Sequence, residues 1–121
     1  MTLILVVDDS PTEVFVIRRA LEQHGYQTAA AADGEEGFRM AKSLKPDLIF
    51  MDIVMPGVNG FQATRQLARD PETKNIPVVM VTSKGQDTDR IWGMRQGAVD
   101  YLIKPVTPQA LVEKAQAVLA H

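Results

Sequence analysis

Short apolar runs and amphipathic stretches alternate along the chain five times. The apolar runs contain no alternating polar residues, which is typical of strands that are buried on both faces of a sheet. The stretches between them repeat apolar residues three and four positions apart, as in helices that cover a sheet. Strands are expected at 3–7, 26–31, 48–51, 78–81 and 101–103. Helices are expected between Ser10 and Gly25, between Asp33 and Pro46, and over 61–69, 87–96 and 107–120.

Residues that start helices support this assignment. Ser10 can cap the first helix, Pro11 suits its first position, and Glu13 stands where the second partner of a capping box belongs. Asp33 is expected to cap the second helix, with Glu36 at its third position. Strands that alternate with helices in this way predict an α/β fold, in which helices cover both faces of a five-stranded parallel sheet.

Polar residues follow four of the five predicted strands. Right-handed crossovers place the carboxyl ends of parallel strands at one edge of the sheet, so these side chains are expected to lie close together. They are Asp8 and Asp9 after the first strand, Asp52 after the third, Thr82 after the fourth and Lys104 after the fifth. Three carboxylates repel one another in a semi-buried site, and protonation, a cation or both must relieve that repulsion. Lys104 supplies one positive charge, and Mg²⁺, which binds carboxylate and phosphate oxygens, would supply two more.

These residue types suit the transfer of a phosphoryl group to a side chain. The reaction needs a nucleophile in line with the leaving group, neutralised charge and donors to the phosphoryl oxygens. Asp52 is the candidate nucleophile, because an aspartate can carry a phosphoryl group. Asp8 and Asp9 would hold the metal, while Lys104 and Thr82 would each donate to one phosphoryl oxygen. Each residue taken alone would be an ordinary cap or turn former, so the prediction rests on the whole set in this strand order.

Four motifs carry these residues: VVDDS at 6–10, MDIVMPGVNG at 51–60, VT at 81–82 and YLIKP at 101–105. Together they resemble the receiver domains of two-component response regulators, over essentially the whole chain. The resemblance implies a flavodoxin-like (βα)₅ doubly wound fold and a phosphoacceptor switch that is not an enzyme beyond catalysing its own phosphorylation and dephosphorylation. Residues 52–67, with Trp92-Gly93, are most similar to single-domain regulators of pilus-associated chemosensory systems, the PilH-like type.

The resemblance also implies the residues of the site. Asp52 would receive the phosphoryl group from a histidine kinase. The peptide bond between Lys104 and Pro105 would be cis, which costs little before proline. Mg²⁺ would be bound by Asp8, Asp9, Asp52 and the backbone carbonyl of Val54.

A conformational switch is implied as well. Thr82 would move toward the phosphoryl group and Tyr101 would rotate inward, which remodels the surface of the fourth helix, fifth strand and fifth helix. A downstream protein would bind there, because phosphorylation shifts the population between two arrangements. Trp92, the only tryptophan, is expected either on this output face or in the core.

Two further residues would flank the path of the water that removes the phosphoryl group. Val54 is apolar and cannot orient a water molecule by hydrogen bonding, so we expect slow self-dephosphorylation. Lys84 would either pair with the phosphoryl group or remain a solvated loop charge.

Composition limits the classes of protein that fit. With 121 residues the chain is expected to be one receiver domain, 1–121, without an output domain, and a monomer or weak dimer. It would act through a partner protein or as a phosphate sink. Fifteen acidic and thirteen basic residues argue against a nucleic-acid binder. The apolar runs are too short for a membrane span or a signal peptide, so a cytoplasmic location is expected. The absence of cysteine excludes disulfides and thiolate sites.

Two alternatives come from other classes. Haloacid-dehalogenase-type phosphatases also use an aspartyl phosphate and magnesium, but they carry D-x-D after the first strand, where this chain has adjacent Asp8 and Asp9. A degenerate receiver that only binds other proteins would not need all five polar residues. A P-loop protein is excluded, since no phosphate-binding glycine loop follows the first strand.

Overall fold

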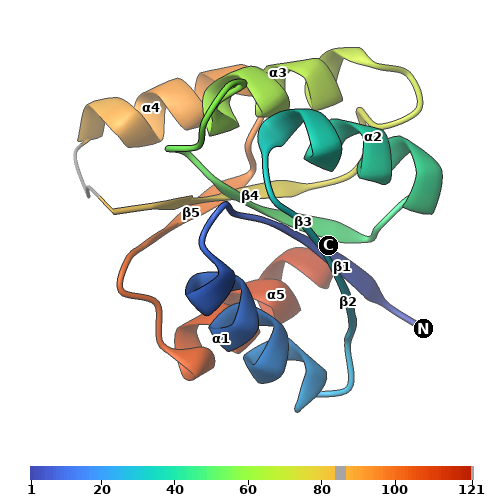
Figure 1. The fold of residues 1–121 in the computed structure, drawn as a ribbon, viewed down its shortest axis with the longest axis vertical. Coiled ribbons are helices and arrows are strands. Elements are labelled where there is room, and N and C mark those ends of the chain that lie inside the picture. The colour runs from blue at the N-terminus through green and yellow to red at the C-terminus, as the bar shows by residue number, and fades with distance from the viewer. Residues whose placement is uncertain (84–86, 121) are drawn as a thin grey trace.

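Five parallel strands form one sheet, and a helix follows each strand within the residues that this computed structural model describes, 1–83 and 87–120 (Figure 1). The strands are β1 (Leu3–Val7), β2 (Gln27–Ala31), β3 (Leu48–Asp52), β4 (Val78–Thr82) and β5 (Asp100–Ile103). The helices are α1 (Pro11–Glu22), α2 (Gly34–Leu44), α3 (Gly60–Arg69), α4 (Asp87–Gln96) and α5 (Pro108–Leu119). The alternation of strands and helices expected from the sequence is confirmed, with boundaries that differ by at most three residues.

The strand order is β2-β1-β3-β4-β5, and all neighbouring strands are parallel. The order and direction confirm the flavodoxin-like fold. The chain moves outward from β1 to β2 and then returns past β1 to β3. The order therefore reverses between β1 and β3, and in sheets of this type the binding crevice lies at the carboxyl ends of the strands at that point.

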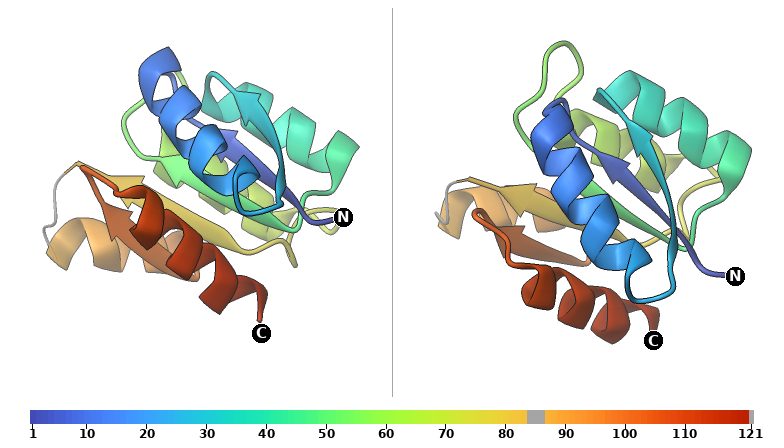
Figure 2. Two further views of the ribbon diagram at one scale, coloured as in Figure 1. Left: turned by 90° about the horizontal axis from the view of Figure 1, so that it is seen from below. Right: turned by 60° about the horizontal axis from the view of Figure 1, so that its bottom comes forward.

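Helices cover both faces of the sheet. In Figure 1, α2, α3 and α4 lie on one face and α1 and α5 on the other, and Figure 2 shows α1 and α5 side by side. Successive residues of a central strand enter opposite core clusters: Ile49 packs toward α2 and α3, and Phe50 packs toward α1 and α5. Every residue of β3 and β4 is buried, which explains why their sequences show no polar alternation. None of the described helices is long and apolar enough to cross a membrane.

The start of α1 differs from the expected capping box. The Ser10 side chain caps the helix by accepting the backbone N–H of Glu13 (3.3 Å), as predicted. The Glu13 side chain, however, does not bond back to Ser10, whose N–H donates to Oδ1 of Asp8 (2.9 Å). The Glu13 carboxylate pairs with Lys104. An ion pair with a charged amine is stronger than a hydrogen bond to a neutral backbone amide, so the reciprocal cap is lost.

The loop between β3 and α3 folds back over the end of β3. Gly60, the first residue of α3, donates its N–H to the carbonyl oxygen of Ile53 (2.8 Å). A Cβ atom at Gly60 would lie 2.1 Å from the carbonyl oxygen of Asp52, so no other residue fits without moving the backbone. This contact holds the loop against the strand end that carries Asp52.

Candidate functional site

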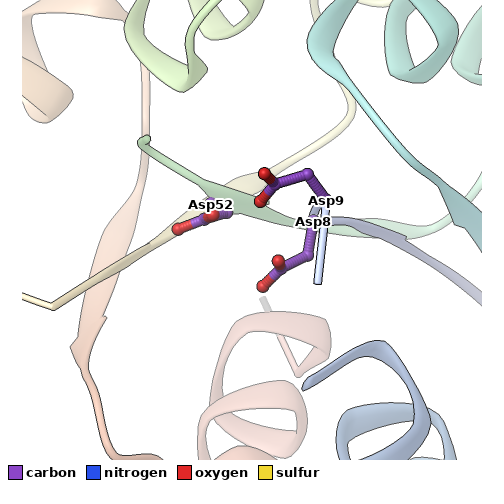
Figure 3. Close-up of side chains that lie close together, drawn as sticks. All are labelled: Asp8, Asp9 and Asp52. Carbon is purple, nitrogen blue, oxygen red and sulfur yellow. The ribbon is translucent and has the colours of Figure 1, made fainter. Parts of the chain in front are cut away.

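Three aspartates meet at the carboxyl ends of β1 and β3. Val7 lies opposite Met51, so Asp8 and Asp52, the next residues along, also lie next to each other. One carboxylate oxygen from each of Asp8, Asp9 and Asp52 lies within 4.8 Å of the others (Figure 3). Asp8 and Asp52 are buried, at 3% and 6% exposure, whereas Asp9 is exposed. The predicted cluster therefore forms, with Asp9 on its solvent side.

Lys104, which follows β5, reaches into this cluster. Its Nζ lies 3.1 Å from Oδ1 of Asp52 and 3.4 Å from Oδ2 of Asp8. A third ion pair joins the same Nζ to Oε2 of Glu13. The peptide bond between Lys104 and Pro105 is cis. The sequence indicated that Lys104 would join the aspartates, and the structure brings it into direct contact with two of them.

Burial and charge shift the titration of all four groups in contact. Burial is the largest effect on Asp8 and raises its pKa to about 6, aided by a hydrogen bond with the Glu13 side chain and opposed by the Ser10 N–H. Burial also raises the pKa of Asp52, against the hydrogen bond from Lys104. Burial by itself lowers the pKa of Lys104, but hydrogen bonds with Glu13 and Asp52 outweigh it and raise that pKa above its usual value. The hydrogen bond from Lys104 lowers the pKa of Glu13.

These shifts describe a site that is short of positive charge. Lys104 stays protonated, yet the pKa of Asp8 is still raised, so one ammonium group does not fully offset the buried carboxylates. The donor atoms are all carboxylate oxygens within reach of one small ion. Such a set suits a hard divalent cation, of which Mg²⁺ is the one that binds few carboxylates and keeps open positions for phosphate oxygens. The residues present therefore fit the expected metal.

Thr82 ends β4 at the same edge of the sheet. Val81 lies opposite Asp52 in the sheet, and Thr82, the next residue, is buried at the end of the same strand. The backbone N–H of Lys104 donates to the carbonyl oxygen of Thr82 (2.6 Å), which keeps the ends of β4 and β5 together. Thr82 thus stands at the same sheet edge as the aspartates.

Tyr101 lies on β5, away from the aspartates, and is half-buried. Its ring packs against the guanidinium of Arg90, 5.5 Å from the ring centre, and Nη1 of Arg90 donates to the Tyr101 hydroxyl (3.4 Å). A cavity of about 520 Å³ lies beside the ring, between α4 and β5. It is lined by Arg90, Ile91, Met94, Arg95, Asp100 and Tyr101.

Three other residues singled out in the sequence have different outcomes. The alternative of a core Trp92 is wrong, because its side chain is 55% exposed, and it lines cavities between α3 and α4 rather than the cavity beside Tyr101. The side chain of Val54 is 75% exposed, beside the aspartates in the chain but turned to solvent. Lys84 lies outside the described residues.

Glu13 is the site residue that the sequence analysis missed, because its position matched a helix cap. The available signal was its place in the first turn of the helix that follows Asp8 and Asp9. An acidic residue in that first turn lies near the edge of the sheet that carries the aspartates. Only the three-dimensional position of Lys104, 91 residues further along, reveals which partner Glu13 takes.

Comparison with known proteins agrees with this geometry. Residues 4–116 match the response regulator receiver domain. The chain is 56% identical to protein PilH of Pseudomonas aeruginosa over 99% of both chains, and 39% identical over 96% of its length to the phosphate regulon transcriptional regulatory protein PhoB of Escherichia coli, of which it covers 51%. The receiver domain of the sensor histidine kinase PA1611 from P. aeruginosa has the same fold, with a TM-score of 0.92 and 30% identity over 99% of this chain and 98% of that one, and its structure has a magnesium ion coordinated in the active site cleft. A family match over nearly the whole chain, on a sheet whose acidic edge has the expected composition, shows that the chain belongs to the response regulator receiver domain family.

Proposed function

We propose that Asp52 is the residue of this receiver that accepts the phosphoryl group, with a histidine kinase as donor. Receiver domains are phosphoacceptor switches, so the open question is which side chain reacts. Asp52 carries the argument because its carboxylate is buried at the switch point of the sheet, 3.1 Å from the Lys104 ammonium group and within reach of two further carboxylates. Asp8 is also buried and contacts Lys104, at 3.4 Å, but its other carboxylate oxygen already accepts the Ser10 N–H (2.9 Å).

The transfer forms one bond and breaks one. An Oδ atom of Asp52 attacks the phosphorus atom, the bond from phosphorus to the donor nitrogen or oxygen breaks, and the donor keeps that electron pair. The product is an acyl phosphate on Asp52. The Lys104 ammonium, already beside Asp52, offsets charge on the phosphoryl oxygens, and the Thr82 hydroxyl donates to another of them. Through these contributions of Lys104 and Thr82 the receiver catalyses its own phosphorylation. The same residues catalyse its dephosphorylation.

The metal site is formed by Asp8, Asp9 and Asp52, with the backbone carbonyl of Val54 as a further oxygen donor. Bound Mg²⁺ supplies positive charge that offsets the acidic cluster and the phosphoryl oxygens. Asp9 is exposed, so the site can exchange its ion with solvent, and the backbone of the 53–59 loop is held near Asp52 by the Gly60 contact.

Signal output follows from a shift of Thr82 and Tyr101. The phosphoryl group attracts the Thr82 hydroxyl, and Tyr101 turns into the space that this movement opens. Tyr101 belongs to β5 and Thr82 ends the neighbouring strand β4, so the surface of α4, β5 and α5 changes shape and becomes the binding site of a downstream protein. Its 56% identity to PilH over 99% of both chains supports a role in chemosensory signalling of the pilus-motility type. We propose that it acts there as a monomer or weak dimer. We propose that this signalling takes place in the cytoplasm.

Incubation with acetyl phosphate and Mg²⁺, followed by intact mass and peptide mapping, tests the proposal. One phosphoryl group, stable in acid and labile in alkali, is expected on Asp52, and Asp52→Asn should remove it. Asp47→Asn is the matched control, because Asp47 lies at the opposite end of β3 and an asparagine keeps its acceptor for the Leu3 N–H. Label at another residue, or none, would refute the assignment. Continuous hydrolysis of p-nitrophenyl phosphate would favour a phosphatase instead.

A further inference from the structure

Lys104 has three carboxylate partners, and one of them lies outside the predicted site. Asp8 and Asp52 are the buried partners, with 2% and 8% of their side-chain surfaces exposed. Glu13, in the first turn of α1, is the third, and 41% of its side chain is exposed. It lies at the rim of the crevice, and the ammonium group is shared between this rim residue and two residues of the metal site.

The shared ammonium competes directly with a metal ion. Nζ of Lys104 contacts Oδ2 of Asp8 and Oδ1 of Asp52, and a bound cation would draw on the same two carboxylates. If Glu13 were absent, these two carboxylates would be the only anionic partners of Lys104 among the described residues. A divalent cation on the aspartates would then repel the ammonium and weaken every ion pair that it has. With Glu13 present, Lys104 keeps an ion pair when the cation takes the aspartates.

Glu13 favours binding of the cation but opposes binding of a phosphoryl group. The oxygens of the group need the Lys104 ammonium, and Glu13 competes for it. Its negative charge also repels the incoming anion. Both effects act in a partly buried crevice, where interactions between charges are stronger than in water.

We propose that Glu13 is a positioning residue, which holds Lys104 at the rim so that a divalent cation can bind Asp8, Asp9 and Asp52, and which opposes binding of the phosphoryl group by retaining that lysine. The inference rests on the proposed function of the site. It predicts effects of opposite sign on two ligands. Loss of Glu13 weakens binding of the cation and strengthens binding of a phosphoryl mimic.

The test uses Glu13→Gln, which removes the charge and keeps the size of the side chain. Calorimetric titration of the metal-free protein with MgCl₂ at pH 7.5 should give an affinity about three- to tenfold lower than in the wild type. Titration with beryllofluoride, an anion that mimics the phosphoryl group, at saturating Mg²⁺ should give an affinity about three- to tenfold higher. A variant that only disturbs the fold would weaken both ligands.

Two further variants complete the design. Glu22→Gln is the matched control, because Glu22 lies on the same helix and pairs with Arg18 (3.8 Å) far from the aspartates, and both affinities should stay unchanged. Glu13→Asp keeps the charge but shortens the reach to Lys104, so it should resemble Glu13→Gln if contact matters. A wild-type magnesium affinity in Glu13→Asp would overturn the positioning role and leave only a general charge effect.

The results separate this proposal from the assignment of Asp52. Neither titration depends on a phosphoryl transfer. Unchanged affinities in Glu13→Gln, or changes of the same sign, would overturn the role of Glu13 while the phosphorylation of Asp52 stands. Absence of phosphate on Asp52 in the wild type would instead refute the function of the site.

Discussion

Replacement of Asp8 by asparagine is expected to stabilise the metal-free domain at neutral pH. The Asp8 side chain is almost fully buried, and burial is the main reason that its pKa rises from 3.8 to about 6. The folded protein therefore binds a proton more tightly at this residue than the unfolded chain does. Between about pH 4 and about pH 6 the folded protein keeps a proton on Asp8 that the unfolded chain has already lost. The free energy of unfolding therefore falls as the pH rises through that window.

The magnitude follows from the two pKa values. Their difference, between about 6 and 3.8, corresponds to about 3 kcal/mol of unfolding free energy lost above pH 6. Asparagine avoids this loss of stability. Its amide oxygen can still accept the Ser10 N–H, which lies 2.9 Å from Oδ1 of Asp8 in the wild type. It forfeits the ion pair with Lys104, which retains Glu13 and Asp52 as partners. We expect Asp8→Asn to be about 1–3 kcal/mol more stable than the wild type at pH 7.5 and nearly equal to it at pH 4.

Urea unfolding in EDTA, followed by far-ultraviolet circular dichroism at pH 7.5 and pH 4, measures this difference. With a denaturant slope of about 1–3 kcal/mol per molar, the midpoint at pH 7.5 should rise by about 1 M. Asp47→Asn serves as the control, because Asp47 is exposed and its substitution should change little at either pH. A lower stability of Asp8→Asn at pH 7.5, or the same difference at both pH values, would show that ionisation of buried Asp8 does not destabilise the domain.

Three further outcomes are expected. Gly60→Ala should lower the free energy of unfolding by about 3 kcal/mol or more, because the new Cβ would lie 2.1 Å from the Asp52 carbonyl oxygen. Gly25→Ala is the control: φ is +89° there and no atom lies within 4 Å, so it should cost about 1 kcal/mol in the same urea assay. Similar costs for the two variants would contradict the packing argument. Mg²⁺ should raise the thermal midpoint more at pH 7.5 than at pH 5, since a proton on Asp8, whose pKa is about 6, competes with the ion; an equal rise would count against Asp8 as a ligand. Val54→Asn should shorten the lifetime of the phosphorylated protein about three- to tenfold, because an amide can orient the attacking water, and an unchanged decay of the labelled species would reject that role for the position.

The fold could be predicted because its signals are local. An apolar run such as 48–51 shows within a few residues that both faces of a strand are buried, and Asp33 and Ser10 mark helix starts by their own side-chain chemistry. The topology of a parallel sheet places the carboxyl ends of its strands at one edge, so the sequence predicts that Asp52 and Lys104 lie close together. The predicted capping box at Glu13 is wrong, because a local sequence pattern does not show that Lys104, near the other end of the chain, pairs with Glu13.

The amino-acid sequence was enough to predict the order of strands and helices, the kinds of side chain at the edge of the sheet, and the type of chemistry that they support. Three features became visible only in the folded protein: the burial that raises the pKa of Asp8, the third ion pair of Lys104, and the exposed position of Trp92 between α3 and α4. Periodicity and capping act between neighbours in the chain, so they can be recognised in the sequence. Desolvation and Coulomb energy depend on distances through space, and packing sets these distances between residues that lie far apart in the sequence.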